Sequence, residues 1–255
     1  MVFLCHSTES AKLQDDFIDA LREYNADGLI ICPAAGTTSA SLRRLIDWHM
    51  PTVMVTRSVP DVQLSYVGNN DVRGMELATE HLIELGHTRI AIIGGSRAIS
   101  TGRDRLTGYL RALEKHSLPV DRSLIVPCPT NRRGGIAAIA QLLDMDGPPT
   151  AAVCLADIVA FGVMLELSRR GLRPGADISV VGHDDVIEAA LWHPPLTTVA
   201  VQRHAMGVAA ASLLTDLRKS DDLGAARDLR AEPDCSRDLR RSAGAIDIQD
   251  GDASR

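Results

Sequence analysis

The sequence lacks a long apolar run, a CxxC pair and an excess of basic residues. Nothing in its 255 residues approaches the roughly 18 consecutive apolar residues of a membrane helix. Residues 1–5 are apolar, but His6 and Glu9 follow without the basic and apolar regions of a signal peptide. We therefore expect a soluble, cytoplasmic protein with no membrane partner.

Basic side chains are in the minority, with 27 Lys and Arg against 33 Asp and Glu and a formal net charge of −6. A surface that binds duplex DNA needs clustered Lys and Arg, so most of this surface is unsuited to phosphate. The five cysteines are odd in number and scattered, which is typical of a reducing compartment.

Motifs of cofactor and enzyme chemistry are also absent from the sequence. The glycines of GGSRAISTGRDRLTGY fit neither a Walker loop nor GxGxxG, and no GxSxG nucleophile elbow occurs. His81 and His87 are six residues apart, so on a helix they lie about 120° apart and do not form an HExxH metal site. We expect no enzyme activity, no cofactor and no metal.

Aromatic residues make up only 3% of the chain, and Trp48 and Trp192 are its only tryptophans. A sugar site usually has an aromatic platform, but a lone Trp more often serves packing or an interface. We assign Trp192 to a dimer interface.

Short β-branched runs alternate with amphipathic segments of helical length. Apolar strands separated by helices indicate parallel sheet covered on both faces. Several of the predicted helices end at a glycine, such as Gly86 and Gly171. The strands are predicted at 2–5, 27–32, 51–56, 89–95, 123–128, 150–156, 178–182 and 196–201, and helices at 12–24, 39–49, 74–86, 107–116, 136–145 and 158–171.

Eight strands are more than a single doubly wound sheet of this kind usually contains. The number favours two α/β lobes with a break near 66–70. The segment after Ser220 has no aromatic residue and many alternating charges, as solvated or disordered chain does. The predicted domains are an N-terminal lobe (1–67 plus 202–220), a C-terminal lobe (68–201) and a charged tail (221–255).

Asp184 and Asp185 follow a predicted strand directly. Adjacent residues cannot easily form a glycosidase pair, whose carboxylates stand about 5–9 Å apart across a bond. Both can be surface and capping groups. Alternatively one carboxylate binds a ligand, since ligand crevices lie at the carboxyl ends of strands in open α/β sheets, and the other caps the next helix. Arg103, where GGSRAISTGRDRLTGY passes from a strand end through a turn into a helix, is either a solvated helix-start side chain or a bidentate donor to vicinal hydroxyls or a carboxylate.

Five segments in order, DGLIICP, MELATEHLIELGHTRIAIIGG, STGRDRLTGYLRAL, ADIVAFGVMLELSRRGLRPGADISVVGHDD and PPLTTV, resemble the effector-binding core of LacI/GalR-type transcriptional regulators. The match runs from about Val2 to Leu217, and the combination of motifs at these separations is specific. The resemblance implies an α/β, periplasmic-binding-protein-like fold with two doubly wound lobes around a cleft for a small molecule such as a sugar or nucleobase.

The same resemblance maps the effector's arginine onto Arg103 and its carboxylate onto Asp184, leaving Asp185 as the helix cap. Thr56 stands where an acidic residue is common, and Ala156-Asp157 stands where Asn-Asp is usual. Because buried polar groups set a pocket's selectivity, these departures mean that the effector cannot be carried over from the family.

Family members begin with a helix-turn-helix, a hinge, and the first strand and helix of the N-terminal lobe, and no segment of this chain matches them. We therefore expect operator DNA to be bound only through a missing N-terminal head. An absent internal strand and helix would remove about 7–15 kcal/mol of apolar burial, comparable with the stability of a whole domain. This pattern suggests a truncated gene, a pseudogene fragment or a start codon placed too late.

The sequence thus predicts the effector-sensing core of a LacI/GalR-like regulator that works as a homodimer, since operators are two-fold symmetric. The alternative is a solute-binding protein of a transporter, which needs an export signal. An enzyme on this fold is a weaker third possibility.

Overall fold

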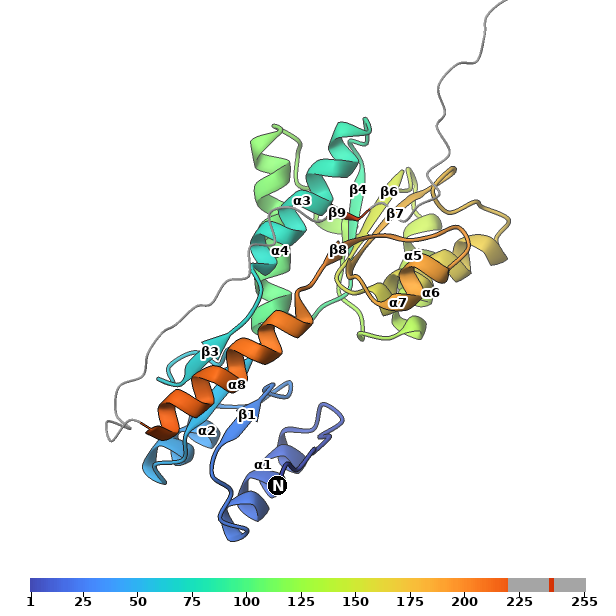
Figure 1. Cartoon of the computed structure of the whole chain (residues 1–255). Helices are drawn as coiled ribbons and strands as arrows, with labels where there is room; N and C mark the ends of the chain where they lie inside the picture. The colour runs from blue at the N-terminus through green and yellow to red at the C-terminus, as the bar shows by residue number, and fades with distance from the viewer. Residues whose placement is uncertain (220–238, 241–255) are drawn as a thin grey trace, which may run out of the picture. The chain divides into compact units, whose positions relative to one another are not determined.

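The computed structural model describes residues 1–219 and 239–240 (Figure 1). The expected solvated tail lies outside these residues, apart from two residues that form a strand. The helices are α1 (Ala11–Glu23), α2 (Ser39–Asp47), α3 (Asp71–Glu84), α4 (Ser100–Lys115), α5 (Arg132–Leu143), α6 (Asp157–Arg169), α7 (Ile187–Leu191) and α8 (Arg203–Lys219). The strands are β1 (Leu29–Ile31), β2 (Thr52–Val55), β3 (Ser65–Val67), β4 (Ile90–Ile93), β5 (Ile125–Val126), β6 (Ala151–Cys154), β7 (Ser179–Asp184), β8 (Thr197–Ala200) and β9 (Leu239–Arg240).

The chain divides into two compact units that interleave in the sequence. Unit 1 contains Met1–Arg73, Gly95–Thr107 and the segment from Val201 through α8, and unit 2 contains Gly74–Gly94 and Gly108–Ala200. The sequence-based boundaries assign 95–107 to the C-terminal lobe, whereas these residues make their contacts in unit 1. The α/β class with parallel sheets is confirmed.

Unit 1 is built on a three-stranded parallel sheet in the order β1-β2-β3. Helices α1 and α2 cover one face, where Ile18, Leu42 and Leu45 pack with Ile31 and Met54. Helix α8 covers the other face through its buried side chains Met206, Ala210 and Leu213, which pack on Val53 and Val67 (Figure 1). The strands are therefore apolar on both faces, as parallel sheets require.

Unit 2 contains a six-stranded sheet in the order β5-β4-β6-β7-β8-β9, parallel except for β9. All four residues of β4 and of β6 are buried. Helices α5 and α6 pack on one face in a cluster that includes Ile139 and Phe161. Close approach of these two helices depends on glycines, because a Cβ on Gly135 or Gly162 would lie closer than 3.0 Å to backbone of the other helix.

The predicted helices are confirmed, with α4 beginning earlier than the predicted segment 107–116. Gly86 and Gly171 follow α3 and α6 with φ of 90° and 77°, so both occupy the left-handed conformation that ends helices.

One strand prediction is wrong, one strand was missed, and the prediction at 123–128 is too long. Residues 2–5 form no strand although they are extended and apolar, because no strand in the described part of the chain pairs with them. Residues 65–67 form β3, which the sequence pattern did not separate from the following loop. Only Ile125 and Val126 of the predicted strand 123–128 pair in the sheet, since a short 3-10 turn takes up Arg122–Leu124.

Among the described residues, no helix is both long enough and apolar enough to cross a bilayer.

Candidate functional site

The carboxyl end of β7 holds two successive residues in an unusual backbone conformation. Asp184 has φ of 124° and Asp185 has φ of 51°. Non-glycine residues seldom adopt positive φ, and such strain tends to be kept at functional sites. The Asp184 side chain is partly exposed, and one of its oxygens lies 3.3 Å from Nδ1 of the buried His183. The turn thus presents the Asp184 carboxylate at the end of the strand.

The prediction that Asp185 caps the following helix is wrong. The N-cap of α7 is Val186, in extended conformation. The backbone N–H of Val186 donates to Oδ2 of Asp157 at 2.9 Å, which fixes the residue before α7, and no side chain caps the N–H groups of α7 itself. The left-handed φ of Asp185 explains the difference, because it turns the chain one residue further before α7 begins.

Asp157 is a fully buried carboxylate at the first position of α6. Its Oδ1 accepts a hydrogen bond from Thr198 Oγ1 at 2.6 Å, and its Oδ2 accepts the Val186 N–H. Thr198 Oγ1 in turn accepts from the Asp185 N–H at 3.3 Å. Both oxygens of Asp157 therefore hold the turn that carries Asp184 and Asp185.

Burial raises the pKa of Asp157, and the hydrogen bonds from Thr198 and Val186 oppose that rise. Gly182 is required beside this carboxylate, because a Cβ at that position would come closer than 3.0 Å to Oδ1 of Asp157. Neither Thr198 nor Gly182 was singled out from the sequence. Their signal was present in the motifs GHDD and PPLTTV, which mark the ends of adjacent strands.

Ala156 is the N-cap residue of α6 and makes no side-chain cap hydrogen bond. The methyl group is buried at the end of β6, beside the strand end that carries Asp184. An alanine at an N-cap leaves the first helical N–H groups without the side-chain acceptor that Ser, Asn or Asp would supply.

In unit 1, Thr56 directly follows β2 with φ of 62°. Its backbone N–H donates to Val67 O, and its carbonyl accepts from Tyr66 Oη, both at 3.0 Å. A β-branched residue in the left-handed region is a genuine outlier. The backbone conformation of Thr56 at the carboxyl end of the sheet is therefore imposed by these hydrogen bonds and not by the conformational preference of threonine.

The arginines of the RDRL segment point to different environments. Arg103 is exposed in the first turn of α4, and its Nη1 donates to Arg97 O at 3.2 Å. Arg105 is buried, and its Nε donates to Oδ1 of the buried Asp71 at 2.7 Å. Arg103 is thus available to solvent, whereas Arg105 is part of the packing of unit 1.

A second charged pair at the strand ends of unit 1 was missed. Arg57 donates to both oxygens of Glu9, at 2.7 and 3.0 Å, and to Pro33 O at 3.2 Å. The hydrogen bond from Arg57 lowers the pKa of Glu9. These residues follow the segments predicted as strands 2–5, 27–32 and 51–56, and that common position is the signal that could have identified them.

Trp192 lies at the end of α7 and stacks on Phe161, with ring centroids 4.5 Å apart. Part of its surface therefore packs against the core of unit 2. Ile187 and Leu191 on the same short helix are 77% and 78% exposed. The exposed apolar surface of this region thus belongs to α7 more than to Trp192.

Within the described part of the chain, no cluster of three or more His, Cys, Asp or Glu residues could hold a metal ion. His87 instead bridges strands, with Nδ1 2.9 Å from Thr150 Oγ1 and Nε2 2.9 Å from Ser179 Oγ. The four cysteines in this part, Cys5, Cys32, Cys128 and Cys154, are free thiols.

In open parallel α/β sheets, ligands bind at the carboxyl ends of the strands, where this chain carries its polar side chains. In agreement, residues 79–238 match the family of periplasmic binding protein-like domains, and the chain belongs to that family. More particularly, its relatives are LacI-family transcriptional repressors, and the chain covers their effector-binding portion.

The HTH-type transcriptional repressor PurR of Vibrio atlanticus is 31% identical over 223 residues, which are 87% of this chain and 66% of that protein. The HTH-type transcriptional repressor CytR of Escherichia coli K12 is 31% identical over 230 residues, covering 90% and 66%. Among solved structures, the complex of transcriptional regulator CelR with cellobiose superposes with a TM-score of 0.76 at 30% identity, covering 82% of this chain and 64% of that one.

The chain spans just under two thirds of the length of these curated relatives. Repressors predominate among them, which does not favour the alternative of a transporter's solute-binding protein.

Proposed function

We propose that this chain senses a small-molecule effector for a LacI-type transcriptional regulator. The observation that carries the proposal is the strained Asp184-Asp185 turn at the end of β7, held by the buried carboxylate of Asp157. Strain of this kind persists where the surrounding structure over-determines it and is typical of ligand sites.

The proposed effector contacts come from the strand ends and from the beginning of α4. Asp184 accepts hydrogen bonds from ligand hydroxyls, and Arg103 donates through its planar guanidinium fork. Thr56 supplies a hydroxyl, and Ala156 supplies a small apolar surface at the N-terminus of α6. Asp157 acts through the turn it holds, because both of its oxygens already accept hydrogen bonds within the chain.

The effector class best supported is a sugar-like molecule with several hydroxyl groups. A carboxylate together with an arginine is suited to bind vicinal hydroxyls. The CelR structure that resembles this chain was solved with cellobiose. A nucleobase-like effector is the second candidate and would use the same two charged groups on ring nitrogens and oxygens.

The partners proposed for the whole regulator are operator DNA, bound by a separate DNA-binding domain, and a second copy of the chain. Operator half-sites related by two-fold symmetry favour a homodimer. The exposed Ile187 and Leu191, next to Trp192, are the apolar side chains that we assign to such an interface. We further propose that the regulator works in the cytoplasm and is not an enzyme; its relatives are named transcriptional repressors, which supports this proposal.

A thermal-shift screen with mono- and disaccharides, nucleobases and nucleosides tests the proposal. A ligand at a hundredfold excess over its Kd stabilises the folded chain by about 2.7 kcal/mol. We expect at least one hydroxyl-rich member to raise the unfolding midpoint. If no member of the panel shifts the midpoint and calorimetry detects no heat of binding, the sensor function is rejected.

A further inference from the structure

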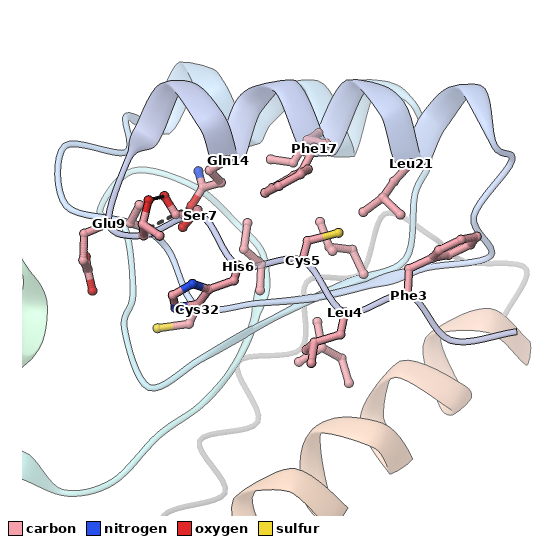
Figure 2. Close-up of a pocket in the computed structure, with 16 residues that line it drawn as sticks. Phe3, Leu4, Cys5, His6, Ser7, Glu9, Gln14, Phe17, Leu21 and Cys32 are labelled. Carbon is pink, nitrogen blue, oxygen red and sulfur yellow. Dashed lines mark hydrogen bonds between the residues drawn. The ribbon is translucent and has the colours of Figure 1, made fainter.

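His183 is the only buried residue among the eight histidines of the chain, with an exposed fraction of 1%. It stands in β7 next to Asp184, the last residue of that strand. The other histidines lie partly or wholly at the surface. His6, for example, is exposed and lines a hollow of about 610 Å³ between α1 and β1 (Figure 2). Because burying an imidazole costs free energy unless its nitrogens are hydrogen-bonded, the position of His183 points to a specific partner.

One partner of His183 is the next residue in the chain. Nδ1 of His183 lies 3.3 Å from Oδ1 of Asp184. The side chains of successive residues in a strand point to opposite faces, so neighbours in sequence rarely meet. Here they meet because Asp184 has φ of 124°, outside the extended region. The strained backbone of Asp184 and its contact with His183 are therefore parts of one arrangement.

The chemistry of this pair indicates which atom carries the hydrogen. An ionised carboxylate only accepts hydrogen bonds, and therefore Nδ1 of His183 carries the hydrogen and donates it. The hydrogen bond engages Oδ1 of Asp184 and restricts rotation of a carboxylate that is 32% exposed. His183 thus sets the direction in which Asp184 presents its oxygens.

Helix α3 leaves space for the imidazole ring through Gly74. A Cβ at that position would lie 3.1 Å from Nε2 of His183 and 3.2 Å from Cγ1 of Val199. Val199 pairs with His183 across β7 and β8. Glycine is less favourable than alanine inside a helix, so its presence in α3 is explained by the ring that it accommodates. The ring of His183 is therefore held in place by α3 and β8 as well as by Asp184.

His183 and Asp157 act on different parts of the same turn. Asp157 accepts hydrogen bonds from the Val186 N–H and from Thr198 Oγ1, so it holds the backbone around the end of β7. Burial is the main cause of the raised pKa of Asp157, while nearby Asp184 raises this pKa further and nearby His183 lowers it. The imidazole is therefore within electrostatic reach of both carboxylates. Asp157 holds the backbone of the turn, and His183 holds the side chain of Asp184.

We propose that His183 is a positioning residue of the effector site, whose Nδ1–H holds the Asp184 carboxylate in the orientation that accepts hydroxyl groups of the effector. His183 itself does not touch the effector, because its ring is buried. The inference rests on the proposed function and adds to it a residue that acts through Asp184.

Packing and positioning make different demands on the side chain at position 183. Packing depends on its volume, whereas positioning depends on a donor at the place of Nδ1. Asparagine brings its amide nitrogen close to the place of Nδ1, and glutamine brings its amide nitrogen close to that of Nε2. Leucine has a volume similar to that of histidine and no donor. Substitution by these three residues therefore separates the two roles.

Calorimetric titration and thermal unfolding test the proposal, with cellobiose, D-glucose, D-ribose, adenine and adenosine as probes. His183→Leu and His183→Gln should lower the affinity for a bound probe by about tenfold, as expected when a hydrogen bond to a charged group is lost. His183→Asn should stay within about threefold of the unaltered chain, because it keeps the donor. Stability should follow the opposite order, since leucine fills the site and asparagine leaves a cavity.

A double variant shows whether His183 acts through Asp184. Asp184→Asn combined with His183→Leu should bind a probe no more weakly than Asp184→Asn alone, because the carboxylate that His183 orients is already absent. Nitrogen NMR of the chain without ligand tests the contact itself. With isotope-labelled histidine, and with His183→Asn to identify the signal, the spectrum should show the hydrogen on Nδ1.

The role of His183 is overturned if His183→Leu binds a probe as tightly as the unaltered chain while Asp184→Asn does not, or if Nδ1 carries no hydrogen. It is also overturned if the losses from the two substitutions add in the double variant, since the residues would then act separately. Effector sensing stands in these cases as long as a probe binds the unaltered chain. If no probe binds the unaltered chain, the proposed function fails, and the role of His183 fails with it.

Discussion

Nε of Arg105 lies 2.7 Å from Oδ1 of Asp71, and both side chains are buried. The pair joins the first residue of α3 to the beginning of α4. A buried ion pair contributes little relative to apolar packing, but removing one partner takes an opposite charge away from a group that stays buried. The stability of this region therefore depends on both partners being present.

From this relationship we predict that Arg105→Ala or Asp71→Ala lowers the free energy of unfolding by about 3–5 kcal/mol. The double variant should lose less than the sum of the two, since both single variants already remove the same ion pair. Urea unfolding of the four proteins of this cycle gives the coupling. Arg103→Ala is the matched control two residues away. It should cost no more than about 0.5 kcal/mol because its side chain is exposed.

Much of the fold was predictable because apolar runs and helix-length segments alternate so regularly. Residues 2–5 failed because a strand needs a partner as well as a pattern. Of the expected site, Asp184 and Thr56 do lie at strand ends. Their positive φ could not be predicted, since local preference argues against positive φ at residues other than glycine, and most strongly at a β-branched residue such as Thr56.

The role of Asp157 was not predictable from its neighbours in sequence. Its two hydrogen-bond partners, Val186 and Thr198, are 29 and 41 residues away. The different environments of Arg103 and Arg105 were easier to predict. Residues two apart on a helix point about 200° apart and cannot share an environment. Which of them faces the interior depended on Asp71, which no motif had marked.

At the contact between α5 and α6, replacing glycine by alanine should lower stability, which is the opposite of its usual effect in a helix. Alanine favours a helix over glycine by about 1 kcal/mol. Nevertheless Gly135→Ala and Gly162→Ala should destabilise unit 2, because each new methyl group would meet backbone of the facing helix at less than 3.0 Å. We expect a loss of about 1–3 kcal/mol each, as for overpacked cores, measured by urea unfolding.

Gly207 in α8 is the control for this effect. It is exposed, and nothing lies within 4 Å of the position of its Cβ. Gly207→Ala should therefore stabilise the protein by about 0.5–1 kcal/mol. Equal effects at positions 135, 162 and 207 would contradict the close packing of α5 on α6.

We predict that ionisation of Tyr109 causes part of the loss of folding stability at alkaline pH. Its buried hydroxyl donates to Ile90 O at 2.9 Å, and burial raises its pKa to about 12. Because the folded-state pKa is raised above the ordinary 10.0, its contribution to stability is complete below pH 10. That contribution is lost as the pH rises through 12. Tyr109→Phe should cost about 1 kcal/mol at neutral pH and remove this part of the alkaline loss.

Absorbance titration at the tyrosinate band, with urea unfolding at neutral and alkaline pH, measures both effects. Tyr24→Phe is the control, since Tyr24 is exposed. If Tyr24→Phe rather than Tyr109→Phe removes the late-titrating group, the assignment is wrong.

Thr56 allows strain and function to be separated. Thr56→Gly should stabilise unit 1 by about 1 kcal/mol, because glycine adopts φ of 62° without a steric penalty. Thr52→Gly, at a buried strand position with ordinary backbone, should instead destabilise. Thermal unfolding of both variants decides the point. If Thr56→Gly also weakens effector binding, the hydroxyl contributes to the site at the expense of stability.

The last prediction concerns effector response. For a ligand found by the thermal-shift screen, Asp184→Asn and Arg103→Gln should each reduce the affinity by tenfold or more, the loss expected on removing a charged hydrogen-bond partner. The unfolding midpoint without ligand should change little, because both side chains are exposed or partly exposed. Calorimetric titration measures the affinity, and urea unfolding measures the stability.

Matched controls separate a lost contact from a lost charge. Arg111→Gln changes an exposed arginine on the same helix as Arg103, and Asp146→Asn changes an exposed aspartate of unit 2. Both should bind the ligand as the unaltered chain does. Asp157→Asn should weaken binding and stability together, since it disturbs the turn that presents Asp184. If Asp184→Asn and Arg103→Gln lower stability as much as Asp157→Asn while leaving affinity intact, both residues are structural and the proposed contacts are wrong.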